Sequence, residues 1–333
     1  QYGEMPPSPE VFRCETACDS EKNKVFRITV GTRAKQMTFM MNISMPEKYS
    51  AKSPVPVVVY GDGCWRYFTL DNFTKEFTDR GIAFCRFDRI SFADDIQFVG
   101  RHHGPIFDIY PDYGFGTIGA WAWGFMRCVD ALETLDYIDK SAIAFTGHSR
   151  GAKTAFLAGM LDERAAIVNP NETNAMGCSC YRIHMKAKNE NGGEGRSETL
   201  RDMWDKFDYW CGEGLEKYAD CEEDLPFDAH TCKAMVAPRI LLVGEAASDI
   251  WTNPVGSWQT SCAAKEVYKF LGVENNLLWY FRKGFHAHTL ADARVLAQVM
   301  MHYRFGEELP DIFYKTPFKQ PEKIWDWKIP EKD

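Results

Sequence analysis

Several features that define common protein classes are absent from this 333-residue sequence. No apolar run approaches the ~20 residues that a membrane-spanning helix needs. The formal net charge is −8, and no basic stripe offsets it, which argues against a nucleic-acid partner. Internal repeats and low-complexity segments are missing as well. We therefore expect a globular chain that binds neither a membrane nor a nucleic acid.

The paired C-x2-C spacing of a structural zinc site is also absent. The nearest patterns are Cys14-x3-Cys18 and Cys178-x-Cys180, so we expect no metal and no organic cofactor. Eleven cysteines are nevertheless many for a cytosolic enzyme. They indicate an oxidising compartment with disulfides, where the odd number leaves at least one thiol free. Because the chain starts at Gln1 rather than Met, we expect a secreted or periplasmic protein whose leader has been removed.

What the sequence does contain is an alternation of short apolar runs with helical patterns. The predicted strands are 24–31, 36–44, 54–60, 82–88, 142–145, 165–170, 239–244 and 277–281, and the predicted helices are 71–80, 119–138, 152–160, 260–271 and 290–305. Such alternation predicts an α/β fold with a mostly parallel sheet between two helical layers. The first two strands read as an antiparallel hairpin.

The remaining segments complete one predicted domain, 1–333. Residues 1–20 are Pro-rich and polar and read as an extended N-terminal arm. Residues 91–118 are predicted to form a long loop, which in a compact domain is usually functional or mobile. The polar stretch 184–224 is predicted to be an insertion over the active site. We expect a monomer.

The segment 141–154, SAIAFTGHSRGAKT, carries the strongest chemical signal. It places G-x-S-x-G between an apolar strand and a helix, which is the context of a nucleophile elbow in an α/β-hydrolase. Glycine permits the sharp turn that would present the Ser149 hydroxyl above the sheet edge. The following helix N-terminus would offer N–H groups to a developing oxyanion.

A serine nucleophile needs a base and an orienting acid, which in this fold follow in the order serine, acid, histidine. The loop after the last predicted strand offers His286 and His288 as the base. Two acids follow predicted strands, Glu172 and Asp249, and chain order alone favours Asp249. A surface carboxylate is the alternative reading for either acid.

Two cations stand at the start of the predicted elbow helix. Arg150 follows the nucleophile directly and could stabilise an oxyanion or bind an acidic substrate. Lys153 lies one turn beyond Ser149 and could reach a bound sugar hydroxyl. A cation at a helix N-terminus is unfavourable unless something uses it, which favours a functional role for both residues.

These motifs resemble those of the glucuronoyl esterases, carbohydrate esterase family 15, from about Val57 to Arg304. The matching stretches are 87–89 (FDR), 121–124 (WAWG), 147–153 (GHSRGAK), 225–230 (LPFDAH) and 237–239 (APR). The family elbow reads G-C/H-S-R-x-G-K, so Ala152 replaces a glycine. The resemblance implies that Ser149 is the nucleophile, that Arg150 supports the oxyanion and that Lys153 contacts the uronate sugar.

The resemblance also bears on the acid and the base. Glu172 precedes the Cys180-Tyr181-Arg182 segment by eight residues, the register of the catalytic Glu in fungal members, and this moves our prediction to Glu172. Asp249 matches the alternative acid of some bacterial members. The G-x-H pattern of the family favours His286 as the base.

Three further expectations come from the resemblance alone. Trp251 is similar to a tryptophan that lines the sugar site, and Glu198 to a polar substrate contact. Fungal relatives join the cysteine that matches Cys180 to one in the helix that matches 260–271, which implies a disulfide between Cys180 and Cys262.

The predicted function is that of a serine esterase acting on esters of (4-O-methyl-)glucuronic acid on xylan, as in lignin–carbohydrate links. Glucuronoxylan or a lignin–carbohydrate ester is then the substrate partner. Two alternatives stay open. One is an acetyl or other carbohydrate esterase on the same fold, and the other is a catalytically silent hydrolase homologue that only binds carbohydrate.

Overall fold

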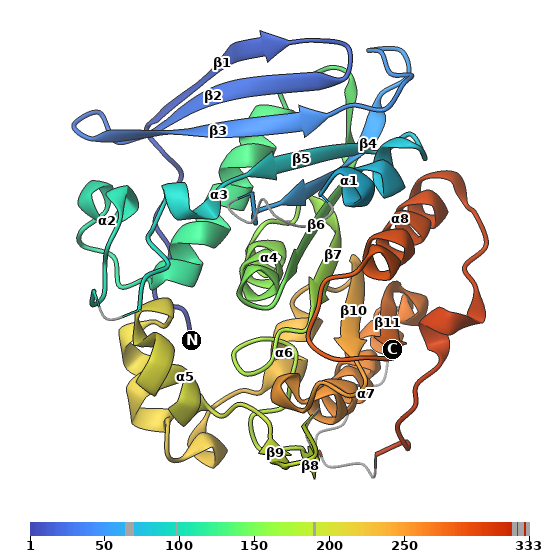
Figure 1. Ribbon diagram of the computed structural model, residues 1–333. Coiled ribbons are helices and arrows are strands. Elements are labelled where there is room, and N and C mark those ends of the chain that lie inside the picture. The colour runs from blue at the N-terminus through green and yellow to red at the C-terminus, as the bar shows by residue number, and fades with distance from the viewer. Residues whose placement is uncertain (64–69, 98, 189–190, 322–324, 326–329, 331–333) are drawn as a thin grey trace.

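The molecule is built on one large sheet, seen in the computed structural model, which describes residues 1–63, 70–97, 99–188, 191–321, 325 and 330 (Figure 1). The nine strands lie in the order β1-β2-β3-β5-β4-β6-β7-β10-β11. Their bounds are β1 Val11–Asp19, β2 Asn23–Gly31, β3 Gln36–Ser44, β4 Val55–Tyr60, β5 Ala83–Phe87, β6 Ile138–His148, β7 Ala165–Asn171, β10 Ile240–Ala246 and β11 Leu277–Arg282. A separate two-stranded sheet pairs β8 (Lys186–Lys188) with β9 (Glu194–Arg196).

The pairing confirms the predicted α/β-hydrolase architecture. From β5 through β4, β6, β7 and β10 to β11 every pairing is parallel. The N-terminal strands β1, β2 and β3 are antiparallel to their neighbours, and β2–β3 is the predicted hairpin. The central strands β4 and β7 are buried along their whole length. Burial on both faces explains the continuous apolar run of β4, whereas β7 also buries the polar residues Asn169 and Asn171.

Helices cover both faces of this sheet (Figure 1). The longer ones are α1 Leu70–Thr78, α3 Thr117–Leu132, α4 Arg150–Leu161, α5 Leu200–Phe207, α7 Pro254–Phe270 and α8 Leu290–Phe305. Apolar residues of α1 and α8 share one core with one face of the sheet. Those of α3, α4 and α7 belong to the second, larger core. The three-layer arrangement is therefore as predicted.

Three local predictions were wrong in part. The segment 1–20 is not only an extended arm, because β1 pairs with β2; its mostly exposed residues give no alternating pattern by which to recognise an edge strand. The stretch 91–118 contains a short helix, α2 (Pro105–Ile109), too brief for a helical period to show. Helix α3 ends at Leu132 rather than 138, since Ile138 already pairs with Val55 as the start of β6. The short helix α6 (Ala229–Ala234) was not predicted.

The insertion 184–224 lies beyond the carboxyl ends of the central strands, where β8, β9 and α5 are seen (Figure 1). Its later part is three 3-10 turns, at Asp208–Trp210, Glu213–Tyr218 and Glu222–Asp224. The N-terminal residues hold it to the body, since the Gly212 N–H donates to the Gln1 carbonyl at 2.9 Å. Within the described part of the chain, no helix combines the length and the hydropathy needed to cross a bilayer.

Candidate active site

The turn between β6 and α4 is a nucleophile elbow. Ser149 has φ 56° and ψ −121°, a backbone conformation that is strained for a residue with a side chain. A Cβ on Gly147 would lie 2.4 Å from the Gly151 carbonyl oxygen, and one on Gly151 would lie 2.2 Å from Asp62 Oδ2. Both glycines of G-x-S-x-G are therefore required by close approach.

The elbow is tied to the end of the neighbouring strand β7. The Ser149 N–H donates to the Asn171 carbonyl at 2.9 Å, and the Lys153 N–H donates to the Ser149 carbonyl at 3.0 Å. The buried Asn171 side chain donates to the Gly147 carbonyl at 3.1 Å. These bonds fix the serine beside Glu172, the residue that follows β7.

The structure brings both predicted acids to the predicted base. His286 Nδ1 lies 2.6 Å from Asp249 Oδ2 and 3.3 Å from Glu172 Oε2. Asp249 comes from the turn after β10, and His286 from the loop after β11. Because the carboxyl ends of parallel strands meet at one sheet edge, residues more than a hundred positions apart converge here.

Besides His286, three other groups among the described residues contact the Glu172 carboxylate. Its Oε1 accepts from Arg282, while Oε2 accepts from the Ala287 N–H at 2.8 Å and lies 3.0 Å from His148 Nε2. Burial raises the pKa of Glu172 to about 8, against the opposing effect of the Arg282 charge. Its φ of 54° is a further sign of a position imposed by its surroundings.

Arg282 is a residue that the sequence analysis missed, and it organises the histidine loop. Its guanidinium donates to the carbonyls of Phe285, at 3.0 Å, and of Ala287, on either side of His286. Its Nε lies 3.3 Å from Asp292 Oδ2, in addition to the Glu172 pair. The signal available in the sequence was an arginine directly after the last predicted strand, 277–281.

The sequence motif gave His148 no role of its own, yet the residue belongs to the network around Glu172 and His286. Its ring lies 4.5 Å from that of His286 and stacks at 5.5 Å on that of His288. Burial, followed by the nearby His286, lowers the pKa of His148 to about 3, so the imidazole is neutral. Burial also lowers the pKa of His288 well below its usual value. Its position directly before Ser149 in the motif was the signal available in the sequence.

Arg150 is oriented from two segments that lie far apart in the sequence. Its Nη1 donates to Asp95 Oδ2 at 3.0 Å, and its guanidinium stacks 4.6 Å above the Trp210 ring. Asp95 belongs to the 91–118 stretch, and Trp210 to the insertion 184–224. Both segments therefore border the residue next to Ser149. The Gly61–Gly63 turn after β4 is pinned to β5, while its continuation at 64–69 lies outside the described residues.

Lys153 is buried, whereas the predicted contact with a bound sugar hydroxyl needs an accessible ammonium group. The side chain is 1% exposed, and its ammonium donates to the Thr173 carbonyl and to the Asn174 side chain. It lies 3.7 Å from Glu198, which is also buried. Burial lowers the pKa of Lys153 to about 8 and raises that of Glu198 to about 7.

Trp251 adjoins the same region. Its carbonyl accepts from the Glu198 N–H at 3.1 Å, and Lys206 Nζ lies 4.8 Å above its ring. The three residues expected to contact substrate, Lys153, Glu198 and Trp251, are thus neighbours. Lys153 and Glu198 are covered by protein groups, whereas Trp251 is partly exposed.

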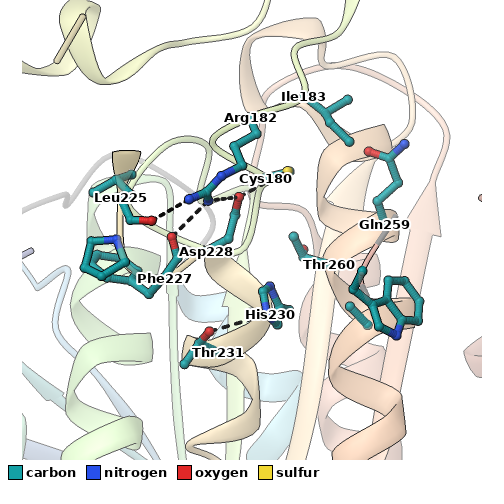
Figure 2. A pocket seen from close by; sticks show the side chains of 13 residues that line it. Cys180, Arg182, Ile183, Leu225, Phe227, Asp228, His230, Thr231, Gln259 and Thr260 are labelled. Carbon is teal, nitrogen blue, oxygen red and sulfur yellow. Dashed lines mark hydrogen bonds and ion pairs between the residues drawn. The ribbon is translucent and has the colours of Figure 1, made fainter. Parts of the chain in front are cut away.

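The predicted disulfide between Cys180 and Cys262 was wrong. Both thiols are free, as are all cysteines in the described ranges. Cys180 Sγ lies 3.4 Å from Asp228 Oδ2, a contact drawn in Figure 2, while Cys262 Sγ accepts from Gln320 at 3.6 Å. Each sulfur is thus engaged by a different partner.

Figure 2 shows the cavity of about 420 Å³ beside Cys180. Arg182 reaches across it to Asp228 at 2.9 Å and to the carbonyls of Leu225 and Phe227. The motif segments around 180–182 and 225–230 therefore meet there. Their contacts brace the chain that follows Glu172 and do not reach His286 in the structure as described.

One trio of side chains could hold a metal ion in the described part of the molecule. The ligand atoms of His148, Glu172 and His286 all lie within 4.8 Å of one another. The cysteine pairs considered in the sequence form no such group among these residues.

A serine on a strained strand-to-helix turn, a histidine after the last strand and carboxylates beside that histidine, on this sheet, define an α/β-hydrolase of the serine hydrolase type. Comparison with known proteins gives the family. The family model described as glucuronyl esterase, fungi, matches residues 28–272. The chain belongs to this family, the glucuronoyl esterases of carbohydrate esterase family 15.

Individual relatives agree. A 4-O-methyl-glucuronoyl methylesterase of Hypocrea jecorina is 27% identical over 339 residues, covering 99% of this chain and 68% of the relative. One of Phanerochaete chrysosporium is 28% identical over 86% of this chain and 58% of its own length. The chain thus spans between about half and two thirds of the length of these curated relatives.

Solved structures show the same likeness. A family 15 glucuronoyl esterase from Caldicellulosiruptor kristjansonii superposes with a TM-score of 0.81 at 27% identity, covering 95% of this chain and 85% of that one. The catalytic domain of the Hypocrea jecorina glucuronoyl esterase gives 0.79 at 25% identity, with 98% and 86% covered.

Proposed function

We propose that this chain is a serine esterase that hydrolyses esters of (4-O-methyl-)glucuronic acid, as found between glucuronoxylan and lignin alcohols. The observation that carries the proposal is the Ser149 elbow beside the His286–Asp249 contact, in a chain of the glucuronoyl esterase family. The names of the curated relatives supply the substrate class.

Acylation follows from the roles of these groups. Ser149 Oγ attacks the ester carbonyl carbon while His286 Nε2 accepts the hydroxyl proton. The backbone N–H of Arg150, at the start of α4, and its guanidinium would stabilise the oxyanion. When the tetrahedral intermediate collapses, the C–O bond to the alcohol breaks and the alcohol leaves with the proton from His286.

Deacylation repeats these steps with water. His286 accepts a proton from the water as its oxygen attacks the acyl carbon. The collapse of the second intermediate breaks the bond to Ser149 Oγ, which recovers its proton from His286. The products are the free uronate and the regenerated serine, so no cofactor takes part in this scheme.

We assign Asp249 as the principal orienting acid and Glu172 as a second carboxylate. The distance of 2.6 Å from His286 Nδ1 to Asp249 supports a direct hydrogen bond, against 3.3 Å to Glu172. Glu172 is already occupied by Arg282, Ala287 and His148. This assignment differs from the prediction made from the register to Cys180, and mutation separates the two.

The buried Lys153–Glu198 pair links the turn after β7 to Trp251, the residues proposed to border the bound sugar. Its bonds to Thr173 and Asn174 hold the turn that carries Glu172. Trp251, whose backbone is bonded to Glu198, offers a partly exposed ring on which a sugar could stack. A polymeric xylan substrate cannot cross a membrane, so we propose that the enzyme acts outside the cytoplasm.

Hydrolysis of benzyl glucuronate beside an acetyl ester of comparable size tests the proposal. We expect the uronate ester to be cleaved with the higher kcat/KM. A faster rate on the acetyl ester would favour the acetyl esterase alternative. Absence of activity on both, with no labelling of Ser149 by a serine-reactive phosphonate, would favour a silent carbohydrate-binding homologue.

A further inference from the structure

The arrangement of nitrogen and oxygen atoms around Glu172 Oε2 suits a second kind of ligand. His148 Nε2 lies 3.0 Å from this oxygen, and His286 Nδ1 lies 3.3 Å from it. Zinc binds histidine nitrogen and carboxylate oxygen at about 2.0–2.2 Å, so tetrahedral ligand atoms lie about 3.3 Å apart. The trio already has nearly this spacing.

The charges around the trio also favour a cation. Arg282 pairs with both Glu172 and Asp292, so one guanidinium faces two carboxylates. Asp249 adds a third carboxylate on the other side of His286. His148 Nε2 already faces Glu172 Oε2, so a ring nitrogen of His148 stands where a ligand atom is needed. Acidic side chains therefore outnumber the one guanidinium in this cluster, which favours binding of a divalent ion.

Glu172 can bind an ion through Oε2 and keep its pair with Arg282, while Oε2 also accepts from the Ala287 N–H. Arg282 uses Oε1, whereas the two imidazoles face Oε2. An ion at this point would replace the contact of His148 Nε2 with Oε2 and the hydrogen bond from His286 Nδ1 to Asp249. Asp249 Oδ2, at 2.6 Å from His286 Nδ1, is near enough to complete the coordination.

We propose that His148, Glu172 and His286 form an inhibitory zinc site inside the esterase active site. Two imidazoles and a carboxylate suit Zn²⁺ better than Mg²⁺, which prefers oxygen ligands. On binding, His286 gives its Nδ1 lone pair to zinc and carries its single N–H proton on Nε2. His148 likewise binds through Nε2 and keeps its proton on Nδ1, so neither ring loses a proton.

Inhibition follows from the position of that proton. With Nε2 protonated, His286 has no lone pair to accept the proton of Ser149. This consequence rests on the proposed role of His286 as general base, whereas the binding of zinc does not. The two parts can therefore be tested apart.

Zinc binding is measured by calorimetry on the full chain as Ser149→Ala, which keeps the trio and removes turnover. We expect one equivalent of Zn²⁺ to bind, and Co²⁺ to give the visible bands of a low-symmetry, four- or five-coordinate ion. Loss of an outer partner already weakens metal binding by about 10–100-fold, so we expect at least ~10-fold weaker binding when His148→Phe is added. His148→Cys, which replaces one zinc ligand with another, should restore it.

A matched control is His302→Phe in α8, where the imidazole contacts the Glu307 carbonyl, away from the trio in sequence and contacts. This variant should bind zinc as before. No zinc binding to the parent protein, or unchanged affinity after His148→Phe in a protein whose circular dichroism shows it folded, would overturn the site. If His148→Phe does not fold, the same comparison is made with His148→Gln.

Inhibition is measured on benzyl glucuronate with ZnCl₂, MgCl₂ and a chelator. We expect Zn²⁺ but not Mg²⁺ to stop turnover of the unmodified protein, and the chelator to restore it. Stoichiometric zinc binding without loss of rate would overturn the inhibitory role and with it the assignment of His286 as base, while leaving the metal site. Failure of the uronate esterase proposal on unloaded protein is seen in the metal-free rate and is thus a separate result.

Discussion

At the scale of single residues, a few side chains at the carboxyl ends of the strands make the contacts on which the proposed chemistry depends. Ser149, the proposed nucleophile, has a strained backbone, and His286 lies against two carboxylates. Arg282 holds the carbonyls on either side of that histidine. Each residue can be tested by removing its functional group while leaving its shape nearly intact.

The nucleophile gives the first prediction. Ser149→Ala should lower kcat on benzyl glucuronate by about a thousandfold or more, because triad members act as a unit. The melting temperature should change little, since one hydroxyl is lost. Ser141→Ala, at an exposed position on the same strand, is the control and should keep full activity. Retention of more than a tenth of the rate in Ser149→Ala would show that the elbow serine is not the nucleophile.

The two carboxylates at His286 give the second prediction. Asp249→Asn should lower kcat by about 100-fold or more, since loss of the orienting carboxylate of a triad can reach ~10⁴-fold. Glu172→Gln should cost less activity and more stability, because it removes one of the two buried carboxylates that pair with Arg282. Steady-state kinetics and denaturant unfolding of both variants check this. A greater kinetic loss in Glu172→Gln would return the acid to the position that the register to Cys180 predicts.

At the level of elements, the site is assembled where strands end and helices begin. Helix α4 carries Arg150 and Lys153 toward segments that arrive from elsewhere in the chain. Arg150 meets the 91–118 stretch and the 184–224 insertion, while Lys153 meets the turn after β7 and the start of α5. The insertion is thus anchored by charges on the elbow helix.

Lys153 gives the third prediction, on the docking of the insertion. Lys153→Met should lower the free energy of unfolding by on the order of 3 kcal/mol, because it leaves buried Glu198 unpaired. Lys153→Met with Glu198→Gln should recover part of this loss, a coupling that a double-mutant cycle measures. Lys140→Met, at an exposed position on β6, should change stability by less than about 0.5 kcal/mol. An unchanged stability with a raised KM for uronate esters alone would instead support the direct sugar contact expected from the sequence.

The whole molecule shows how burial changes the groups at the sheet edge. Glu172, Glu198 and Glu245 have raised pKa values, to about 8, 7 and 8, with burial as the largest cause. Burial has the opposite effect on His148, whose pKa it lowers. The pH dependence of stability is therefore a sum of opposing contributions, and single variants are needed to separate them.

His148 gives the fourth prediction. Its pKa in the folded protein is about 3, whereas an unfolded chain titrates near ~6.5. Between these values the unfolded state binds more protons, so His148 makes the free energy of unfolding fall as the pH falls through this window. Subtracting the stability profile of His148→Phe from that of the unmodified protein should isolate this slope. Glu172 has the opposite effect, because its pKa is raised to about 8, so it makes the free energy of unfolding fall as the pH rises toward that value. If the stability profiles of His148→Phe and of the unmodified protein run parallel, His148 is not held neutral in the folded protein.

The sequence by itself determined much of this protein, because its signals are local. Continuous apolar runs identify buried parallel strands, and the G-x-S-x-G segment between strand and helix identifies the elbow. Family motifs placed Ser149, His286 and both candidate acids, and His286 meets both acids in the structure. Edge strand β1 was missed because its burial does not alternate along the strand. Helix α2 was missed because it is too short to show a helical period.

Only the tertiary structure decided how the candidates pair. The distance from His286 to each acid, the burial of Lys153 and the separation of Cys180 from Cys262 depend on contacts between segments distant in the chain. Local patterns and spacing hold no information on such distances. Arg282 and His148 gained their roles in the same way, because a sheet edge collects the ends of many strands and gives each side chain the neighbours that set its charge and its chemistry.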